Sequence, residues 1–194
     1  AGLIFGSGMA AVSTVLLAFL KKGDHIVLSR HSYGGTQNLV LEEFGAMGIE
    51  YTFIGGTDVS EYADAIQPNT RVLYLETPSN PLMLITDLQA VASLAREKGL
   101  LTIIDNTFAS PVNQNPADFG IDIVIHSATK YMGGHSDICA GAIAGSSEHI
   151  DRVFQLAKNL GGSLSDFTVW MLERSLKTMG LRVKAQSDNA LKVS

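Results

Sequence analysis

Short runs of apolar residues recur along the chain, separated by stretches whose apolar positions follow a helical spacing. Most of the runs are continuous rather than alternating, which is typical of strands that are covered on both faces of a sheet. The sequence therefore predicts strands at residues 3–5, 25–29, 50–54, 71–76, 100–105, 122–127 and 140–145.

The stretches between these runs carry signals for helix ends. Asp58, with Glu61 three residues later, has the pattern of a capping box, and Thr86 and Gly99 stand where a cap and a stop are expected. A further helical region begins near Ser165 and extends beyond residue 184. The other predicted helices cover residues 8–22, 35–47, 58–66 and 86–98, and the first two end at glycines.

This alternation of strands and helices predicts an α/β fold with a mostly parallel sheet and helices on both faces. We expect a single domain, because no linker rich in Pro, Gly or Ser and no internal repeat interrupts the chain. Ligands of such sheets bind at the carboxyl ends of the strands. The residues that directly follow each apolar run are therefore the candidates for function.

Composition narrows the classes of function. Of the 194 residues, 46% are hydrophobic and 17% are charged, as in globular proteins. A net charge of −5 without a basic run argues against a nucleic-acid partner, and no apolar stretch is long enough to predict a membrane span. The one cysteine, Cys139, excludes an internal disulfide framework and fits a reducing, cytoplasmic compartment.

The segment GSGMAA, residues 6–11, follows the first apolar run and opens a helix. Small residues there leave backbone N–H groups free to hold an anion, with a plain helix cap as the alternative. The segment lacks the third glycine of a dinucleotide fingerprint, and Ser29 and Arg30 stand where that motif needs an acidic residue. The segment is therefore not a dinucleotide motif, and an anion site and a plain helix cap both stay open here.

Three other strand ends carry candidate ligand-binding side chains. Tyr33 precedes two glycines and either packs or offers a flat face to an aromatic ligand. Asn80 lies between two prolines in ETPSNP, where a structural turn is the alternative. Asp105 ends the apolar run LLTIID, where a carboxylate is costly unless it caps the next segment or holds a cation.

Lys130 lies in HSATKYMGGHSD, residues 126–137, beside Ser127 and Thr129. Taken alone, Lys130 is most simply interpreted as an ordinary solvated lysine in a surface loop. Together, however, the strand ends offer a helix N-terminus and hydroxyls for a phosphate, an aromatic face for a ring, a carboxylate for a ring nitrogen and a lysine for an aldehyde. These groups match pyridoxal 5′-phosphate (PLP), which is held by a Schiff-base lysine and an aspartate.

The motifs GSGMAA, YGGT, ETPSNP, DNTF and HSATKYMGGHSD resemble those of the Cys/Met metabolism family of PLP enzymes. This family includes cystathionine gamma-synthases, cystathionine gamma- and beta-lyases, methionine gamma-lyases and O-acetylhomoserine sulfhydrylases. The later segment GGSLSDFTVWMLERSLKTMGLRV is similar too, and the spacings of 25 residues from Asn80 to Asp105 and from Asp105 to Lys130 agree with the family pattern.

The resemblance implies a fold and an activity. The fold is the large domain of a fold-type I, aspartate aminotransferase-like PLP enzyme. The activity is a lyase or transferase of transsulfuration and methionine and cysteine metabolism, which acts on C–S bonds by gamma-elimination, gamma-replacement or beta-elimination. Family members assemble as homotetramers, as dimers of dimers, and act on sulfur-containing amino acids.

The resemblance also implies roles for single residues. Lys130 would hold the cofactor as an aldimine and move substrate protons, Asp105 would keep the pyridine nitrogen protonated, and Tyr33 would stack on the ring and act as acid or base. These three are the catalytic candidates. The implied cofactor-binding residues are Gly8, Met9, Tyr33, Asn80, Asp105, Ser127, Thr129 and Lys130.

The chain also departs from the family pattern. It opens inside a strand–turn–helix without Met and stops inside a helical pattern, so we expect residues 1–185 to be an N-terminally truncated large domain and 186–194 to start the connection to a small C-terminal domain. The family's Tyr-x-Arg phosphate contact and its arginine for the substrate carboxylate fall outside the chain, which is expected to be poorly active alone. Gly35 stands where methionine gamma-lyases carry cysteine, which argues against that specificity.

Three alternatives stay open at this point. The chain is either an enzyme domain, a phosphate-binding α/β module without covalent chemistry, or a catalytically incomplete fragment. Lyase and synthase share the cofactor residues, so the sequence does not separate them. His126, His135 and Asp137 hint at a metal site, but with one cysteine and no ligand-bearing helix nearby no metal is predicted.

Overall fold

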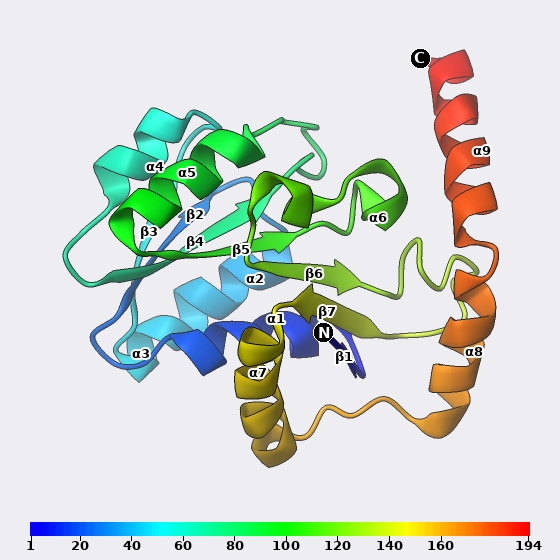
Figure 1. Ribbon diagram of the computed structural model, residues 1–194, viewed down its shortest axis with the longest axis horizontal. Coiled ribbons are helices and arrows are strands. Elements are labelled where there is room, and N and C mark those ends of the chain that lie inside the picture. Colours follow the sequence, from blue (N-terminus) through cyan, green and yellow to red (C-terminus); the bar gives the residue numbers. More distant parts are fainter.

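The computed structural model describes residues 1–194 and has a seven-stranded sheet at its centre, with strand order β1-β7-β6-β5-β4-β2-β3 (Figure 1). Strand β7 is antiparallel to both of its neighbours, β1 and β6, and all other neighbouring pairs are parallel. The predicted mostly parallel sheet is thus confirmed. The strands are β1 Gly2–Phe5, β2 His25–Ser29, β3 Glu50–Ile54, β4 Thr70–Glu76, β5 Leu101–Asp105, β6 Ile123–Ser127 and β7 Gly141–Gly145.

Helices cover both faces of the sheet, as predicted: α1 and α7 lie on one face, and α4 and α5 lie on the other (Figure 1). The helices are α1 Gly8–Phe19, α2 Gly34–Asn38, the π-helix η1 Leu39–Phe44, α3 Gly45–Met47, α4 Val59–Ala65, α5 Leu88–Lys98, α6 Ser110–Asn113, the 3₁₀-helix η2 Pro116–Phe119, α7 Ser147–Leu160, α8 Asp166–Leu176 and α9 Met179–Val193.

Two apolar cores hold these layers together. The larger packs Val15, Leu16 and Phe44 against strand residues such as Ile26, and the smaller packs α4 and α5 against the other face. Every residue of β2 is buried. Burial on both faces explains why inner strands such as β2 are continuous apolar runs rather than alternating patterns.

Several predicted helix ends are wrong in detail. The first helix ends at Phe19 rather than Lys22, and Gly23 lies in the following turn. The predicted helix 35–47 contains the π-helical segment Leu39–Phe44. The helical region after Ser165 is divided into α8 and α9 near Thr178, and the sequence prediction omitted α7 altogether.

The predicted capping box at Asp58 does not form. Asp58 is the cap residue of α4, but its side chain accepts no hydrogen bond there. The Glu61 carboxylate instead accepts hydrogen bonds from the amides of Gly55 and Gly56, at 3.0 and 2.8 Å. The cap of α5 is Asp87 rather than Thr86, because the Asp87 side chain accepts a hydrogen bond from the Ala90 amide at 3.0 Å.

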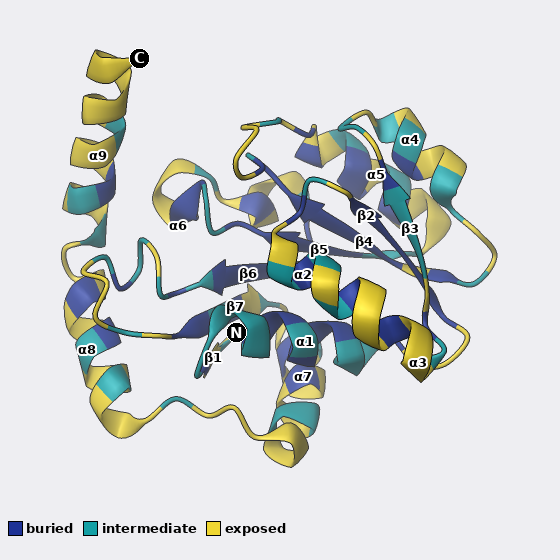
Figure 2. Cartoon of the chain, turned by 180° about the vertical axis from the view of Figure 1, so that it is seen from behind, coloured by how far each residue is buried: buried dark blue, intermediate teal, exposed yellow.

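Helices α8 and α9 extend away from the sheet and are largely exposed (Figure 2). The Arg182 side chain of α9 donates to the carbonyl of Ser175 in α8 at 2.9 Å and to that of Tyr131 at 2.8 Å, so it joins the two helices to each other and to the rest of the chain. No helix in the structure combines the length and the apolar character needed to cross a membrane.

Candidate active site at the carboxyl edge of the sheet

All of the predicted site residues line one cavity of about 830 Å³ at the carboxyl ends of the parallel strands. The strands β1, β4, β5 and β6 end at this edge because they run in the same direction. The predicted residues brought together there are Gly8, Met9, Tyr33, Asn80, Asp105, Ser127, Thr129 and Lys130.

The N-terminus of α1 faces Ser127, which ends β6. A Cβ atom on Gly8 would lie 2.9 Å from both Cβ and Oγ of Ser127, so only glycine allows this close approach. The Ser7 hydroxyl accepts a hydrogen bond from the Ala10 amide at 3.0 Å, while the amides of Gly8 and Met9 have no intrahelical acceptor. Two free amides beside a hydroxyl form a cradle for a small anion.

The hydroxyl groups of Ser127 and Thr129 differ in their hydrogen bonds. The Ser127 amide donates to Thr107 Oγ1 at 2.7 Å, and the Ser127 hydroxyl is left beside Gly8. The Thr129 hydroxyl, in contrast, accepts from the Ala140 amide at 2.9 Å and donates to the Ala140 carbonyl at 3.2 Å. A bound anion would therefore compete with that carbonyl for the Thr129 proton, whereas the Ser127 hydroxyl is available.

Asp105 is a buried carboxylate that faces the cavity. Its Oδ1 accepts a hydrogen bond from the Thr107 amide at 2.9 Å. Burial raises the pKa of Asp105, and the hydrogen bonds from Thr107 oppose that rise. A cationic group in the cavity would stabilise the ionised form, because an opposite charge at close range favours the charged carboxylate.

Tyr33 presents its ring at the mouth of the cavity, with about half of the residue exposed (51%). Its ring lies over Gly35, because a Cβ atom on Gly35 would come within 2.6 Å of Tyr33 Cε1 and 3.0 Å of Met9 Sδ. The glycine thus lets the ring and Met9 approach one another.

Lys130 and Asn80 complete the lining of the cavity and are both exposed. The Lys130 amide donates to the Ser127 carbonyl at 3.1 Å, and the Lys130 carbonyl accepts from the Gly134 amide at 2.7 Å. The main chain of Lys130 is thus held in a turn. Its side-chain amine forms no salt bridge, because the ion pairs of the structure involve other residues.

Sequence reasoning missed Glu76, the last residue of β4 and a buried carboxylate of the same cavity. Glu76 is the register partner of Asp105 on the neighbouring strand. The pKa of Glu76 is raised to about 7, mainly by burial and also by the nearby Asp105, while hydrogen bonds from the main chain at Tyr33 and Asn80 oppose the rise. The signal that singled out Asp105, a carboxylate at the end of an apolar run, applies equally to Glu76.

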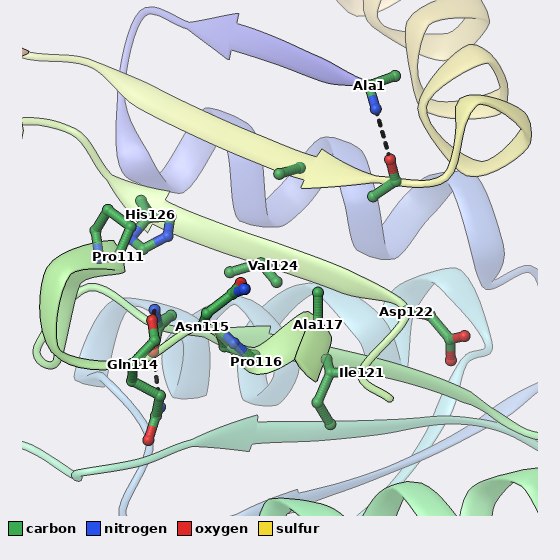
Figure 3. A pocket seen from close by; sticks show the side chains of 13 residues that line it. Ala1, Pro111, Gln114, Asn115, Pro116, Ala117, Ile121, Asp122, Val124 and His126 are labelled. Carbon is green, nitrogen blue, oxygen red and sulfur yellow. Dashed lines mark hydrogen bonds between the residues drawn. The ribbon is translucent and has the colours of Figure 1, made fainter. Parts of the chain in front are cut away.

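A second, smaller cavity of about 310 Å³ lies elsewhere along the sheet and contains none of the predicted site residues (Figure 3). It is lined by His126, Asn106 and Gln114, of which the last two share a side-chain hydrogen bond of 2.7 Å. Burial lowers the pKa of His126 to about 4, so this histidine is neutral at ordinary pH. His126 is buried, whereas His135 and Asp137 are exposed. No group of three His, Cys, Asp or Glu side chains is arranged to hold a metal ion.

Comparison with known proteins gives one consistent family. The sequence pattern of the Cys/Met metabolism PLP-dependent enzymes matches residues 1–194. Cystathionine beta-lyase MetC of Bacillus subtilis is 45% identical over 194 residues, which are 100% of this chain and 50% of that protein. Cystathionine gamma-synthase/O-acetylhomoserine (thiol)-lyase of the same organism is 42% identical over 190 residues, which are 97% of this chain and 51% of that protein.

A solved structure shares the fold closely. The crystal structure of cystathionine gamma-lyase from Lactobacillus plantarum, complexed with L-serine, superposes with a TM-score of 0.96 at 42% identity and covers 100% of this chain and 51% of that one. The chain thus spans about half the length of the relatives that it matches.

Proposed function

The chain belongs to the Cys/Met metabolism family of PLP-dependent enzymes, and from this premise we propose that it forms the cofactor-binding part of an enzyme that cleaves or forms C–S bonds in sulfur-containing amino acids. The observation that carries the proposal is the meeting of Lys130, Asp105 and the Gly8–Ser127 cradle in one cavity. These groups come from three different strand ends.

The residues of the cavity fit PLP group by group. The free amides of Gly8 and Met9 and the hydroxyl of Ser127 suit its phosphate, and Thr129 adds a second hydroxyl at the cost of its bond to Ala140. The buried Asp105 suits the protonated ring nitrogen, because the carboxylate otherwise lacks a charged partner. The fit rests on the close approach that Gly8 permits and on the buried carboxylate.

Two residues would complete the binding of the cofactor. Tyr33 would stack on one face of the ring, and Asn80 would lie beside the phenolic oxygen. Bound PLP supplies an electron sink for negative charge that develops on the substrate carbon next to the amino group.

The protein residues would hold this sink in place and move protons. The Lys130 amine would bind the aldehyde covalently, and after release it would take a proton from the substrate and return one. Asp105, as an anion, would keep the ring nitrogen protonated. Tyr33 would act as acid or base near the leaving group.

The reaction class is a C–S bond elimination or replacement, either gamma-elimination, gamma-replacement or beta-elimination. The relatives named above are a beta-lyase, a gamma-synthase/(thiol)-lyase and a gamma-lyase, with identities between 42 and 45%. Such even similarity favours none of these reactions over another. The proposed enzyme is therefore a lyase or a transferase whose substrate is a sulfur-containing amino acid.

The organisation of the whole protein is part of the proposal. We place residues 1–185 in the large domain and 186–194 at the start of a connection to a smaller domain, which would supply an arginine for the substrate carboxylate. A homo-oligomer, arranged as a dimer of dimers, would complete the phosphate site with a partner segment. The proposed compartment is the cytoplasm.

The test is the visible absorption spectrum of the PLP-supplemented protein, extended at both ends to the length of its relatives. We expect a band from PLP bound covalently at Lys130 that disappears in Lys130→Ala, while the far-ultraviolet circular dichroism is unchanged because Lys130 is exposed. Lys98→Ala, an exposed lysine at the end of α5, should keep the band. A band that survives in Lys130→Ala would refute the assignment and favour a non-covalent phosphate-binding module.

A further inference from the structure

Glu76 occupies a place in the cavity to which the proposed function above gives no role. Its side chain is buried at the end of β4, directly beside Asp105 in the register of β4 and β5. Its Oε2 atom accepts a hydrogen bond from the main-chain amide of Tyr33 at 2.6 Å. The two residues are 43 positions apart in the sequence, so this bond joins two separate strand-end loops.

The Tyr33 ring has little else to hold it. The residue is 51% exposed, and its hydroxyl forms no hydrogen bond within the chain. Its main chain, in contrast, is fixed on both sides: the carbonyl accepts from the amides of Thr36 and Gln37 at 2.9 and 3.1 Å, and the amide donates to Glu76. The main chain therefore sets the point from which the Tyr33 side chain leaves its loop, and the ring lies against Gly35.

The bond between Glu76 and Tyr33 is short and belongs to the strong class when the carboxylate is ionised. It forms inside the cavity wall, where water competes little for either partner. The Glu76 carboxylate binds a main-chain amide of the neighbouring loop and so fixes the position of that loop.

We propose that Glu76 is a positioning residue, which holds the Tyr33 ring over the cofactor cavity through its hydrogen bond to the Tyr33 amide. This inference rests on the proposed function, since the ring that Tyr33 would cover is that of PLP. The groups that face Glu76 are the Asp105 carboxylate, the buried Tyr74 and the Tyr33 loop. Glu76 itself needs no contact with the cofactor for this role.

The chain offers a matched control. Glu61 also accepts main-chain amides through one carboxylate oxygen, those of Gly55 and Gly56, but it does not line the cavity. Removal of Glu61 thus tests the general loss of a carboxylate that anchors a loop. Removal of Glu76 tests the same loss at the cofactor cavity.

The experiment measures the affinity for PLP and the circular dichroism that the bound cofactor shows in its visible band, in the protein extended to the length of its relatives. Glu76→Ala should lower the affinity for PLP about tenfold and reduce the visible circular dichroism, because loss of one charge-assisted hydrogen bond lets the Tyr33 loop and its ring move. Glu76→Gln should restore most of both, because its amide oxygen still accepts from Tyr33. Glu61→Ala should match the wild type.

A double-mutant cycle with Tyr33→Ala makes the test specific. If Glu76 acts through Tyr33, then Glu76→Ala has little further effect once the ring is removed. Should Glu76→Ala fail to fold, Glu76→Asp replaces it, since it keeps the charge but withdraws the acceptor by one methylene. Equal PLP affinity and dichroism in Glu76→Ala and wild type, or additive effects in the cycle, would overturn the positioning role. Absence of the covalent PLP band from the wild type itself would instead refute the proposed function.

Discussion

Replacement of Gly8 by alanine tests the anion cradle most directly. The new Cβ atom would lie 2.9 Å from Cβ and Oγ of Ser127 and 3.1 Å from its Cα atom. Ser127 ends a strand and its amide is bonded to Thr107, so it is not free to move aside. The N-terminus of α1 must then shift away from Ser127 by several tenths of an ångström.

Such a shift moves the amides of Gly8 and Met9 relative to the Ser127 hydroxyl. Loss of one hydrogen bond to a charged group costs about 1.5–3 kcal/mol, which corresponds to a roughly 10- to 150-fold weaker affinity for a phosphate ligand. The intrinsic helix propensity acts the other way, since alanine is favoured over glycine inside helices by up to about 1 kcal/mol. We therefore expect the affinity for PLP to fall while the stability of the fold changes little.

The assay is a titration of the protein with PLP, followed by absorbance, together with urea unfolding without cofactor. Gly45→Ala is the matched control, because Gly45 lies in α3 in a right-handed helical conformation and a Cβ there would meet no atom within 4 Å. That variant should bind PLP like the wild type. Unchanged PLP affinity in Gly8→Ala would refute the argument that Gly8 and Ser127 form the phosphate cradle.

Three other predictions follow from the same contacts. In the protein extended to the length of its relatives, Asp105→Asn should fold normally but lose most of its activity, measured as release of ketoacid or thiol, because a neutral amide cannot stabilise a protonated ring nitrogen. Wild-type rates would mean that Asp105 only caps the Thr107 turn. Ser7→Ala should lower the free energy of unfolding by about 1 kcal/mol, whereas Asp58→Ala should have a smaller effect, because Ser7 accepts a hydrogen bond from its helix through its side chain and Asp58 does not. The cofactor-free protein should lose stability as pH rises from 4.5 to about 7, by up to about 3 kcal/mol, because the folded state holds the Glu76 proton more tightly than the unfolded state does. Glu76→Gln should reduce this loss in urea titrations at pH 5 and pH 8, and an identical loss in that variant would show that other groups cause it.

The sequence by itself determined the layers of the fold. Strands β2 and β3 were predicted at their observed bounds. For β2 the reason is that a continuous apolar run of this length is favourable only when both faces of the strand are covered. The site followed from the same pattern. Residues that end parallel strands must meet at one edge of the sheet, so Asp105, Ser127 and Lys130 could be grouped before their distances were known.

Tertiary structure decided which partner each polar group takes. The Thr129 hydroxyl bonds to Ala140, the Glu61 carboxylate bonds to Gly55 and Gly56 rather than to its own helix, and Glu76 holds Tyr33. Strand order and register bring Ala140 to Thr129 and Tyr33 to Glu76, whereas the path of the loop before α4 brings Gly55 and Gly56 to Glu61. A hydrogen bond acts over about 3 Å, so the sequence supplies the donors and acceptors while the folded path of the chain selects the pairs.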